Sequence, residues 1–539
     1  MSMGFKLFIV GYMIGLPVFL WAGPPPGYRL IWSDEFNGAT LDTKKWNRYT
    51  SPKRDGINTK EAIKVVDGRL EISTYTSNSV NYTGMMSTDF WFNFRYGYIE
   101  ARVKFGDTKG MWSSFWLFTD RVGKYIYNPA LSGMEIDIFE HRGVDAGGHP
   151  IKERIGRGLN WNGYGPYRTI LYQVTSDVGV DEGYHTFGMK WTPQLYSYSI
   201  DKSEPWTIFV PTSARNERIM LSSEIVNAYG WCGRPPRGGY GSLEDTQTKF
   251  KVDYVRVYQK PPVINSLTNM ILRGETAAWC IPFSVEDVET EPWLITVSAS
   301  ITNNSSFITN MVITDGANPW MSKDIGYVST TTSTHVSGSF ITLVGAGEGF
   351  GGREDAGRFL SQPLVGDGDI QVVVDRMENT NNEATAGIMV RSENTKTAKN
   401  VYLYVTPEGM VVFQHRSSAG GKTYQGGTII TTEFPVRLRL ERKGDVFIAS
   451  AKRNKWGKWK LLCRKEIALG NAQAGLAVSS HKPDVFCNTL FRSLSGSLLT
   501  GGERLLVVCP TVEGSGEVSV DVTARDEWLE ATQSFSIAK

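Results

Sequence analysis

The sequence predicts an all-β protein made of several sandwiches. From residue 28 to residue 259, short stretches of alternating apolar and polar residues are separated by Gly, Pro and Asn turns, as expected for strands. This part of the chain keeps no 3.6-residue hydrophobic period, which favours an all-β sandwich. The chain has 539 residues, too many for one hydrophobic core, and several domains are expected. The strands expected in the first part lie at 69–74, 98–104, 115–119, 185–191, 196–200 and 250–258.

Composition is typical of a soluble globular protein, with 41% hydrophobic and 21% charged residues. The net charge of +2 gives no reason to expect a nucleic-acid partner. Aromatic residues make up 12% of the chain, including 16 Trp, which suits both β-sandwich cores and sugar stacking. We expect a monomer.

The N-terminal residues have the pattern of a signal peptide. Lys6 precedes an apolar run from residue 7 to residue 22, and Gly23 with three prolines follows it. This predicts cleavage of residues 1–22 and secretion to the extracellular space or the periplasm. A membrane anchor is the alternative, but the run is short for a span and contains Gly and Pro. No other apolar run is long enough to cross a bilayer, so no span is expected after cleavage.

The segment Gly133-Met134-Glu135-Ile136-Asp137-Ile138-Phe139-Glu140 alternates acids with apolar residues that favour strands. On a strand, Glu135 and Asp137 share one face, but Glu140 lies five positions from Glu135 and would face the other side. A β-bulge after Asp137 adds one residue and turns Glu140 onto the face of the other two acids. The apolar residues between them then pack into the layer behind.

Three carboxylates on one face cannot all stay ionised at low cost, so their pKa values are expected to differ. Two carboxyl groups with opposite protonation states are what glycoside hydrolysis requires. For the segment taken alone, a solvated strand face with chance acids is the alternative.

The segment and its flanks resemble glycoside hydrolase family 16, in the bulged form of laminarinases, agarases and κ-carrageenases. The flanking matches are, in order, Ile31-Trp32-Ser33-Asp34-Glu35-Phe36, Tyr96-Gly97-Tyr98-Ile99-Glu100-Ala101-Arg102, Gly110-Met111-Trp112-Ser113-Ser114-Phe115-Trp116 and Val252-Asp253-Tyr254-Val255-Arg256-Val257-Tyr258. The resemblance covers about residues 28–259. It implies a catalytic domain at residues 23–259, built as a β-jelly roll (a concanavalin-like sandwich) whose concave sheet forms a cleft.

The resemblance also implies roles for the three acids. Glu135 attacks the anomeric carbon, Glu140 first donates and then accepts a proton, and Asp137 assists by bonding Glu135. A retaining reaction needs the two carboxyl groups about 5–5.5 Å apart, whereas four pleats of a flat strand span roughly 13 Å. The sheet must therefore be concave. No cofactor is expected for catalysis.

Further positions are candidates for binding the polysaccharide. Trp112 matches the family tryptophan that floors the cleft, whereas Trp116 is as well explained as a core residue. Asn160 stands where many relatives have His, and Trp161 beside it offers a second platform for a sugar ring. Arg95 is either a ligand of sugar hydroxyls or merely solvated. The candidates are Trp112, Trp116, Arg95, Asn160, Trp161 and Trp231.

Relatives often hold a structural Ca²⁺ on the convex side. The positions that match this site are Glu35, Gly68 and Asp253, which would supply carboxylate and carbonyl oxygens.

The remainder of the chain predicts two accessory domains. Residues 263–317 contain too few strands for a sandwich, and the missing strands appear in 499–539. Together these halves resemble one immunoglobulin- or cadherin-like domain. The intervening residues, 318–498, carry their own run of strands and resemble a concanavalin- or laminin-G-like domain inserted into a loop.

The five cysteines are an odd number. Cys280 and Cys509 come from the two halves of the discontinuous domain, so a disulfide between them is one expectation. Cys463 and Cys487 are close enough in sequence to pair, and Cys232 has no evident partner.

The resemblance favours an endo-acting enzyme cleaving a β-1,3-glucan. A galactan such as agar, porphyran or κ-carrageenan is the alternative, because a basic run follows the acids and could read sulfate. The run consists of Arg142, Lys152, Arg154 and Arg157. A non-catalytic carbohydrate-binding protein is the alternative from another class.

Overall fold

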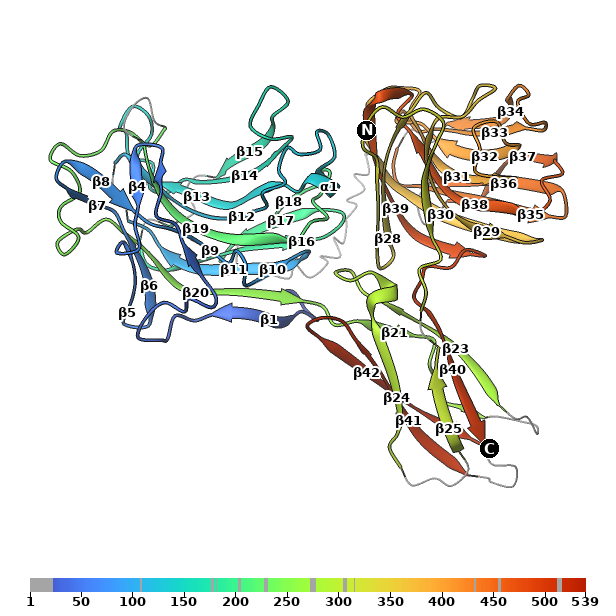
Figure 1. The fold of residues 1–539 in the computed structure, drawn as a ribbon, viewed down its shortest axis with the longest axis horizontal. Helices are drawn as coiled ribbons and strands as arrows, with labels where there is room; N and C mark the ends of the chain where they lie inside the picture. The colour runs from blue at the N-terminus through green and yellow to red at the C-terminus, as the bar shows by residue number, and fades with distance from the viewer. Residues whose placement is uncertain are drawn as a thin grey trace, which may run out of the picture.

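The computed structural model describes residues 23–539 except 107–108, 176–178, 181, 202–204, 227–230, 272–277, 304–307, 315, 431–432, 454–456 and 511–515. The predicted signal peptide at residues 1–22 lies outside the described residues. The described chain is almost entirely β, as predicted, and folds into three sandwiches (Figure 1). Within the described residues, no helix is long and apolar enough to cross a membrane.

The first sandwich is a β-jelly roll of two eight-stranded antiparallel sheets. We call them the cleft sheet and the outer sheet. The cleft sheet consists, in order, of β15 (Thr169–Thr175), β14 (Ile155–Trp161), β13 (Glu135–Arg142), β12 (Met111–Phe118), β19 (Glu217–Ile225), β9 (Met85–Ser87) and β2 (Asn47–Arg48), with β10 (Asn93–Phe94) paired to β19. The outer sheet consists of β18 (Trp206–Ile208), β17 (Tyr196–Ile200), β16 (His185–Trp191), β11 (Gly97–Lys104), β20 (Lys249–Gln259), β6 (Arg69–Ser73) and β5 (Ile63–Val66), with β1 (Arg29–Asp34) paired to β20.

Aromatic side chains fill the space between these two sheets. Phe139 of β13 lies 4.6 Å from Phe187 of β16, between ring centroids, and Phe115 and Phe250 are fully buried beside them. Burying a large aromatic side chain contributes about 1.5–3 kcal/mol. Because Phe139 packs in this core, the opposite face of β13 points away from the core.

A small sheet and one short helix complete the first sandwich. The small sheet consists of β3 (Pro52–Lys53), β4 (Gly56–Asn58), β8 (Val80–Thr83) and β7 (Tyr75–Ser77). The helix α1 (Pro129–Ser132) lies in the connection from β12 to β13, and Asn128 caps its start by accepting from the Leu131 N–H at 3.1 Å.

The second sandwich is small and is built from both ends of the remaining chain. One sheet consists of β21 (Val263–Asn265), β23 (Trp279–Glu286), β40 (Glu503–Pro510) and β25 (Ile308–Ile313). The other consists of β22 (Met270–Ile271), β42 (Glu530–Ala538), β41 (Glu517–Arg525) and β24 (Thr296–Ile301), and a 3₁₀ turn spans Pro292–Leu294. The pairing of β23 with β40 joins segments more than two hundred residues apart.

The third sandwich lies between these two segments of the chain. One seven-stranded sheet consists of β26 (Met321–Ile325), β29 (Gly357–Leu364), β38 (Ala472–Ser479), β31 (Thr385–Arg391), β32 (Asn400–Val405), β33 (Met410–Arg416) and β34 (Tyr424–Ile430). The other consists of β27 (Ser333–Ser337), β28 (Phe340–Gly347), β39 (Lys482–Gly496), β30 (Gly368–Met377), β35 (Val436–Lys443), β36 (Val446–Arg453) and β37 (Lys460–Glu466). It is a complete sandwich inserted into the second.

The cysteines do not pair as predicted. Cys280 lies opposite Val507 in the register of β23 and β40, so Cys509 is its diagonal neighbour, and no disulfide joins them. Cys487 is buried and its thiol donates to the Glu378 carbonyl at 3.5 Å, whereas Cys463 lies on the edge strand β37, and these two are not joined either.

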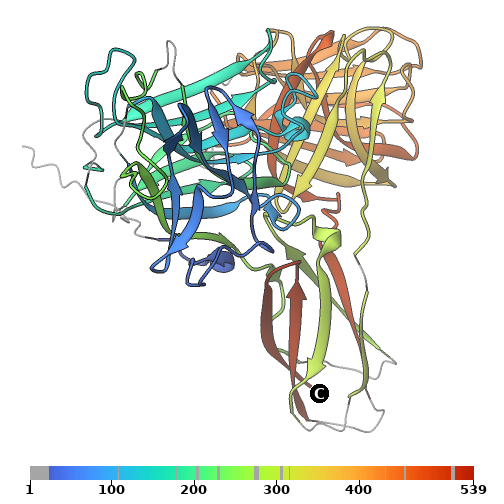
Figure 2. The same ribbon diagram turned by 60° about the vertical axis from the view of Figure 1, so that its left-hand side comes forward.

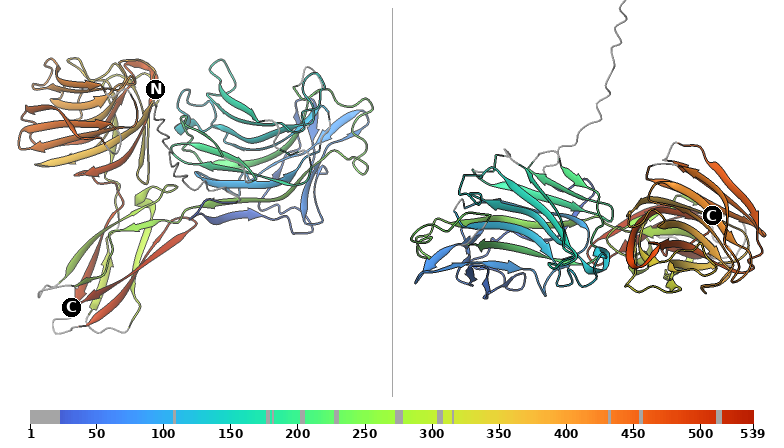
Figure 3. Two further views of the ribbon diagram at one scale, coloured as in Figure 1. Left: turned by 180° about the vertical axis from the view of Figure 1, so that it is seen from behind. Right: turned by 90° about the horizontal axis from the view of Figure 1, so that it is seen from above.

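The first and third sandwiches lie side by side above the second, as Figures 1 and 2 show. Seen from behind and from above, the side of the first sandwich that carries α1 faces the inserted sandwich (Figure 3). Polar contacts tie the parts together: the Gln194 amide donates to Asp375 at 2.8 Å, and Arg376 donates to the Gln194 carbonyl at 3.0 Å. Phe486 of β39 joins the core of the first sandwich.

Candidate active site

The predicted β-bulge is present in β13. On the neighbouring β14, Asn160, Gly158 and Gly156 lie opposite Glu135, Asp137 and Glu140, respectively. The three β14 positions are two residues apart, whereas the last step on β13 spans three residues, so β13 carries the extra residue. On the other side, Trp116 lies opposite Asp137 and Ser114 opposite Glu140. The bulge thus places all three acids on the cleft face.

The burial of β13 follows this change of register. Ile136, Ile138 and Phe139 are each at most 2% exposed and lie in the core, whereas the three acids are partly exposed. The acids line a cavity of about 570 Å³ on the cleft sheet, together with side chains of β12, β14 and β15. This volume is in the range of a site for a ligand of several rings.

Two neighbours hold the Glu135 carboxylate. The Asn160 amide donates to Oε1 at 3.2 Å, and the Tyr164 hydroxyl donates to Oε2. Asn160 in turn accepts from Arg168 Nε at 3.2 Å. Hydrogen bonds to both oxygens fix the orientation of this carboxyl group.

The pKa values of Glu140 and Asp137 are both raised. Burial raises the pKa of Glu140 to about 7; a hydrogen bond from Tyr172 lowers it, and the Glu135 charge raises it. Burial, with the charges of Glu140 and Glu135, raises the pKa of Asp137 well above its usual range. Near neutral pH, Asp137 therefore retains its proton, and Glu140 holds one in about half of the molecules.

Two glycines of β14 make room for these groups. A Cβ on Gly156 would lie 1.7 Å from the Tyr172 hydroxyl, and one on Gly158 would lie 2.9 Å from Asp137 Oδ2. Any larger residue at either position would displace the side chains that surround Glu140 and Asp137.

A fourth carboxylate lies in the cleft. Glu224 of β19 lies opposite Trp112 and pairs with Lys53 Nζ at 2.9 Å and Arg54 Nε at 2.7 Å, and it lines the same hollow as the three acids. Both cations come from the small sheet and its β3–β4 turn. The sequence argument missed Glu224, Lys53 and Arg54 because only the strand register brings them together.

Two of the predicted tryptophans wall the cleft beside the acids. Trp112 lies under the Arg54 guanidinium at 5.0 Å, and its ring meets the Trp231 ring edge-to-face at 5.6 Å. Both rings line the 570 Å³ cavity. Trp116 lies further along β12, where its indole N–H donates to Ser222 at 3.2 Å and Lys53 lies over its ring at 5.0 Å.

Two predicted binding residues lie elsewhere. Arg95 donates to the Glu289 carbonyl at 2.6 Å and lies 3.4 Å from the Glu291 carboxylate, so it joins the first sandwich to the second. Trp161 follows Asn160 on β14, so its side chain faces the opposite side and packs against the core. Neither is a cleft residue. The residues found at the cleft instead are Tyr164, Arg168 and Tyr172. The sequence pattern that indicates Tyr172 is its alternation with Ile170 and Val174 along β15.

The basic run does not form one patch. Arg142 stacks on the Trp231 ring at 3.9 Å. Arg157 shares the core side of β14, and burial lowers its pKa to about 10. Lys152 and Arg154 are exposed in the preceding turn.

The predicted calcium ligands are engaged by arginines. Glu35 accepts two hydrogen bonds from Arg256, at 3.0 and 2.7 Å. Asp253 pairs with Arg102 at 2.5 Å and Arg69 at 3.5 Å, and Gly68 lies in the turn between β5 and β6 with φ +71°. Among the described residues, no group of three or more His, Cys, Asp or Glu side chains has the geometry of a metal site. The carboxylates of Glu35 and Asp253 are thus paired with arginines, and the calcium site stays a prediction.

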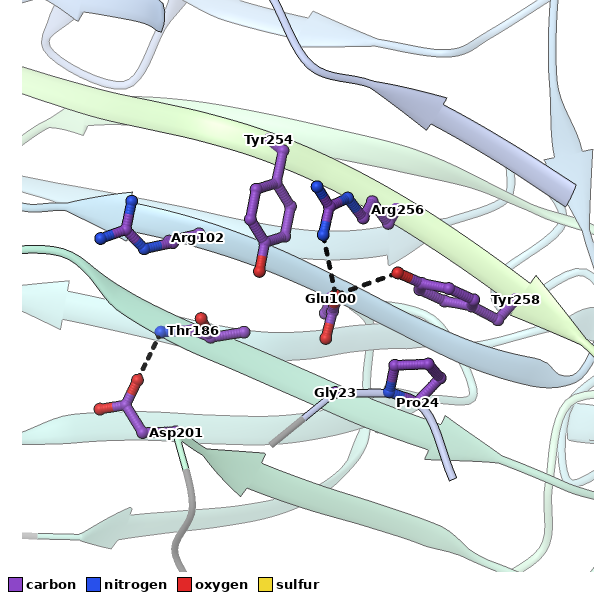
Figure 4. Close-up of a pocket in the computed structure, with 9 residues that line it drawn as sticks. All are labelled: Gly23, Pro24, Glu100, Arg102, Thr186, Asp201, Tyr254, Arg256 and Tyr258. Atoms are coloured by element: carbon purple, nitrogen blue, oxygen red, sulfur yellow. Dashed lines mark hydrogen bonds and ion pairs between the residues drawn. The ribbon is translucent and has the colours of Figure 1, made fainter. Parts of the chain in front are cut away.

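The outer sheet carries a separate cavity of about 440 Å³ (Figure 4). Its Glu100 accepts from Tyr98 and Tyr258 at 3.3 Å each and lies 4.0 Å from Arg256. Across the cavity, Asp201 accepts from the Thr186 N–H at 2.8 Å. The two acids line the same cavity, but each is bound to its own partners. The bulged strand with three carboxyl groups on one face lies on the cleft sheet.

Glu217 anchors the start of β13. Its Oε1 accepts from the Met134 N–H at 3.1 Å and from Ser213 Oγ at 2.7 Å, and burial raises its pKa to about 8. The folded state thus keeps a proton that the unfolded state releases above pH of about 4.5.

Stability is expected to fall as pH rises toward 8, and Glu217→Gln is expected to remove this contribution. Between pH 6 and pH 8 the variant should gain about 2 kcal/mol in free energy of unfolding relative to wild type. Urea unfolding followed by tryptophan fluorescence at the two pH values measures this. An equal fall in both proteins would show that Glu217 ionises normally in the folded state.

Part of this chain is similar to known proteins. Residues 31–260 match the family model described as "Beta-porphyranase A-D, GH16 domain". The chain is 24% identical to glucan endo-1,3-beta-glucosidase A1 of Niallia circulans, over 43% of this chain and 38% of the relative. It is 27% identical to keratan-sulfate endo-1,4-beta-galactosidase of Sphingobacterium multivorum, over 43% of this chain and 56% of the relative.

The chain thus spans about half or less of the length of these two relatives. Among solved structures, the laminarinase from Flavobacterium sp. UMI-01 matches 43% of this chain and all of its own chain, with 24% identity and a TM-score of 0.35. Residues 31–260 of this chain form a glycoside hydrolase family 16 domain.

Proposed function

We propose that the protein is an endo-acting glycoside hydrolase that cleaves a β-linked polysaccharide with retention of configuration. The observation that carries the proposal is the bulged β13, which sets an oriented Glu135 and a Glu140 of raised pKa on one face of a cleft. A non-catalytic lectin does not need carboxyl groups that converge on one face of a cleft, whereas retaining hydrolysis requires them.

In the first step, Glu135 attacks the anomeric carbon while Glu140 donates its proton to the glycosidic oxygen. The leaving sugar departs with that proton, and the other sugar is esterified to Glu135. In the second step, Glu140, now a carboxylate, takes a proton from water. The hydroxide oxygen bonds to the anomeric carbon, and Glu135 is released. Asp137 keeps a proton between the two and limits their repulsion.

For the substrate, a sulfated β-galactan of the porphyran type has the most support. The matching family model is one of porphyranases. The cavity contains Arg168, whose Nε is bound to Asn160 and which forms no ion pair among the described residues. A planar guanidinium beside the acids is suited to bind a sulfate ester. A β-1,3-glucan is the second candidate, because a relative is a glucan endo-1,3-beta-glucosidase.

Product release from porphyran, agarose, κ-carrageenan, laminarin and mixed-linkage glucan tests this choice. We expect oligosaccharides from porphyran, and a loss of at least about tenfold in kcat/KM for Arg168→Ala on this substrate because one charged contact is lost. Products from laminarin alone would assign the glucan. No product from any of the five would contradict the proposed function.

The pH dependence of turnover is expected to follow Glu140. The acid must be protonated to act, so kcat/KM should fall about tenfold per pH unit above pH of about 7. The Tyr172 hydrogen bond lowers the pKa of Glu140, so Tyr172→Phe is expected to move the alkaline limb to higher pH. Initial rates of the wild type and the variant from pH 5 to 9 measure the alkaline limb of each. An alkaline limb that does not move in the variant would contradict the role of Glu140 as the acid.

A further inference from the structure

A cavity of about 540 Å³ lies between the first sandwich and the inserted one. On one side its wall includes Lys124, Tyr127 and Tyr167, which belong to the loops before β13 and before β15. On the other side the wall includes Thr331 before β27 and Asp484 of β39. Neither domain forms this cavity alone.

The two sides of the cavity are held together by contacts outside it. The Asn128 amide donates to the Thr331 carbonyl at 3.3 Å, and its oxygen accepts from Ser333 Oγ at 3.2 Å. Phe486, which also lines the cavity, is 4% exposed and belongs to the same hydrophobic cluster as the core of the first sandwich. The cavity is therefore part of a packed junction.

The lining has the chemistry of a carbohydrate site. Tyr127 and Tyr167 meet edge-to-face at 5.9 Å, yet they are 41% and 54% exposed. Exposed tyrosine rings offer an apolar face for the C–H groups of a sugar and a hydroxyl for its oxygens. Lys124 and Asp484 add a donor and an acceptor on opposite walls.

The same loops also form the wall of the catalytic cleft. Tyr164, which donates to Glu135, and Tyr167 lie on one loop between β14 and β15. The Tyr127 N–H donates to Asn162 of that loop at 2.6 Å, and a Cβ on Gly123 would lie 2.4 Å from Gly163 Cα. The loop thus turns Tyr164 toward the cleft and Tyr167 toward the cavity.

We propose that this cavity is a second glycan-binding site, made jointly by the two domains, which takes sugar units of the same polysaccharide that lie beyond the cleft. The proposal rests on the proposed function. A polysaccharide that extends from the cleft across the loop at Tyr164 contacts the inserted domain. The inserted domain therefore takes part directly in binding the substrate.

The test compares long and short substrates in the full chain. For Tyr127→Ala/Tyr167→Ala we expect kcat/KM on porphyran to fall about tenfold, whereas kcat/KM on a porphyran tetrasaccharide, the short substrate of the pair, stays within twofold. Asp484→Ala changes only the inserted domain and is expected to show the same pattern with a smaller loss. Tyr424→Ala, which removes a tyrosine of similar exposure on the distant edge strand β34, is the control and should change neither value.

Binding is measured separately by the retardation of Glu135→Gln chains in gels that contain porphyran or laminarin. Adding the two tyrosine substitutions should weaken retardation about tenfold in the gel that retards the parent. Equal losses on the long and short substrates, or undiminished retardation, would overturn the second site. If the wild-type chain releases no product but its retardation still depends on the two tyrosines, only the proposed hydrolysis is overturned.

Discussion

Replacing Glu135 by Gln is expected to lower kcat at least about 10⁴-fold, which corresponds to about 5.5 kcal/mol of transition-state stabilisation. The amide keeps the shape of the carboxyl group and its contact with Asn160, but it cannot form the ester with the sugar. Binding of the polysaccharide should persist, because it depends on Trp112, Trp231 and the rest of the cleft. Steady-state rates of oligosaccharide release, together with retardation in a polysaccharide gel, measure the two effects.

The matched control for this variant is Glu100→Gln. Glu100 likewise lies in a strand of the first sandwich, but on the outer sheet, where it is buried and burial raises its pKa. The control is expected to keep kcat within twofold. Unchanged product release by Glu135→Gln would contradict the assignment of the nucleophile.

Replacing Glu140 by Gln is expected to lower kcat about 10²–10⁴-fold on the polysaccharide. The loss should be much smaller on an aryl glycoside of the same sugar, because an acidic phenol leaves without a proton. Azide is expected to restore turnover of the aryl glycoside in a Glu140→Ala variant and to yield the β-glycosyl azide, since the small anion can attack the ester on Glu135 without a general base.

The contrast between substrates separates Glu140 from a merely structural residue. A substitution that only disturbs the cleft would lower both rates alike and would give no azide product. Such a result, in a variant whose thermal unfolding matches wild type, would contradict the role of Glu140 as acid and base.

The bulge shows what spacing alone can predict. Acids at positions 135, 137 and 140 cannot share a face of a regular strand, and the apolar residues between them favour a strand, so an inserted residue is the simplest solution. The register against Asn160, Gly158 and Gly156 has this form. The same parity explains the error at Trp161, because a residue adjacent to Asn160 must face the core.

Other features depend on contacts between distant segments. Glu224 meets Lys53 and Arg54 only after β19 pairs with β12 and the β3–β4 turn folds over the cleft. Arg95 is engaged by Glu289 and Glu291 of another domain. No local pattern carries this information, because the partners are set by sheet order and domain packing.

The stereochemistry of the first product tests the account most directly. Proton NMR of a digestion in progress shows the anomeric configuration of the new reducing end before mutarotation. If Glu135 is the nucleophile, the β-anomer forms first, because two displacements restore the configuration of the substrate. If the α-anomer forms first, water attacks directly, and Glu135 cannot form the covalent intermediate on which the account depends.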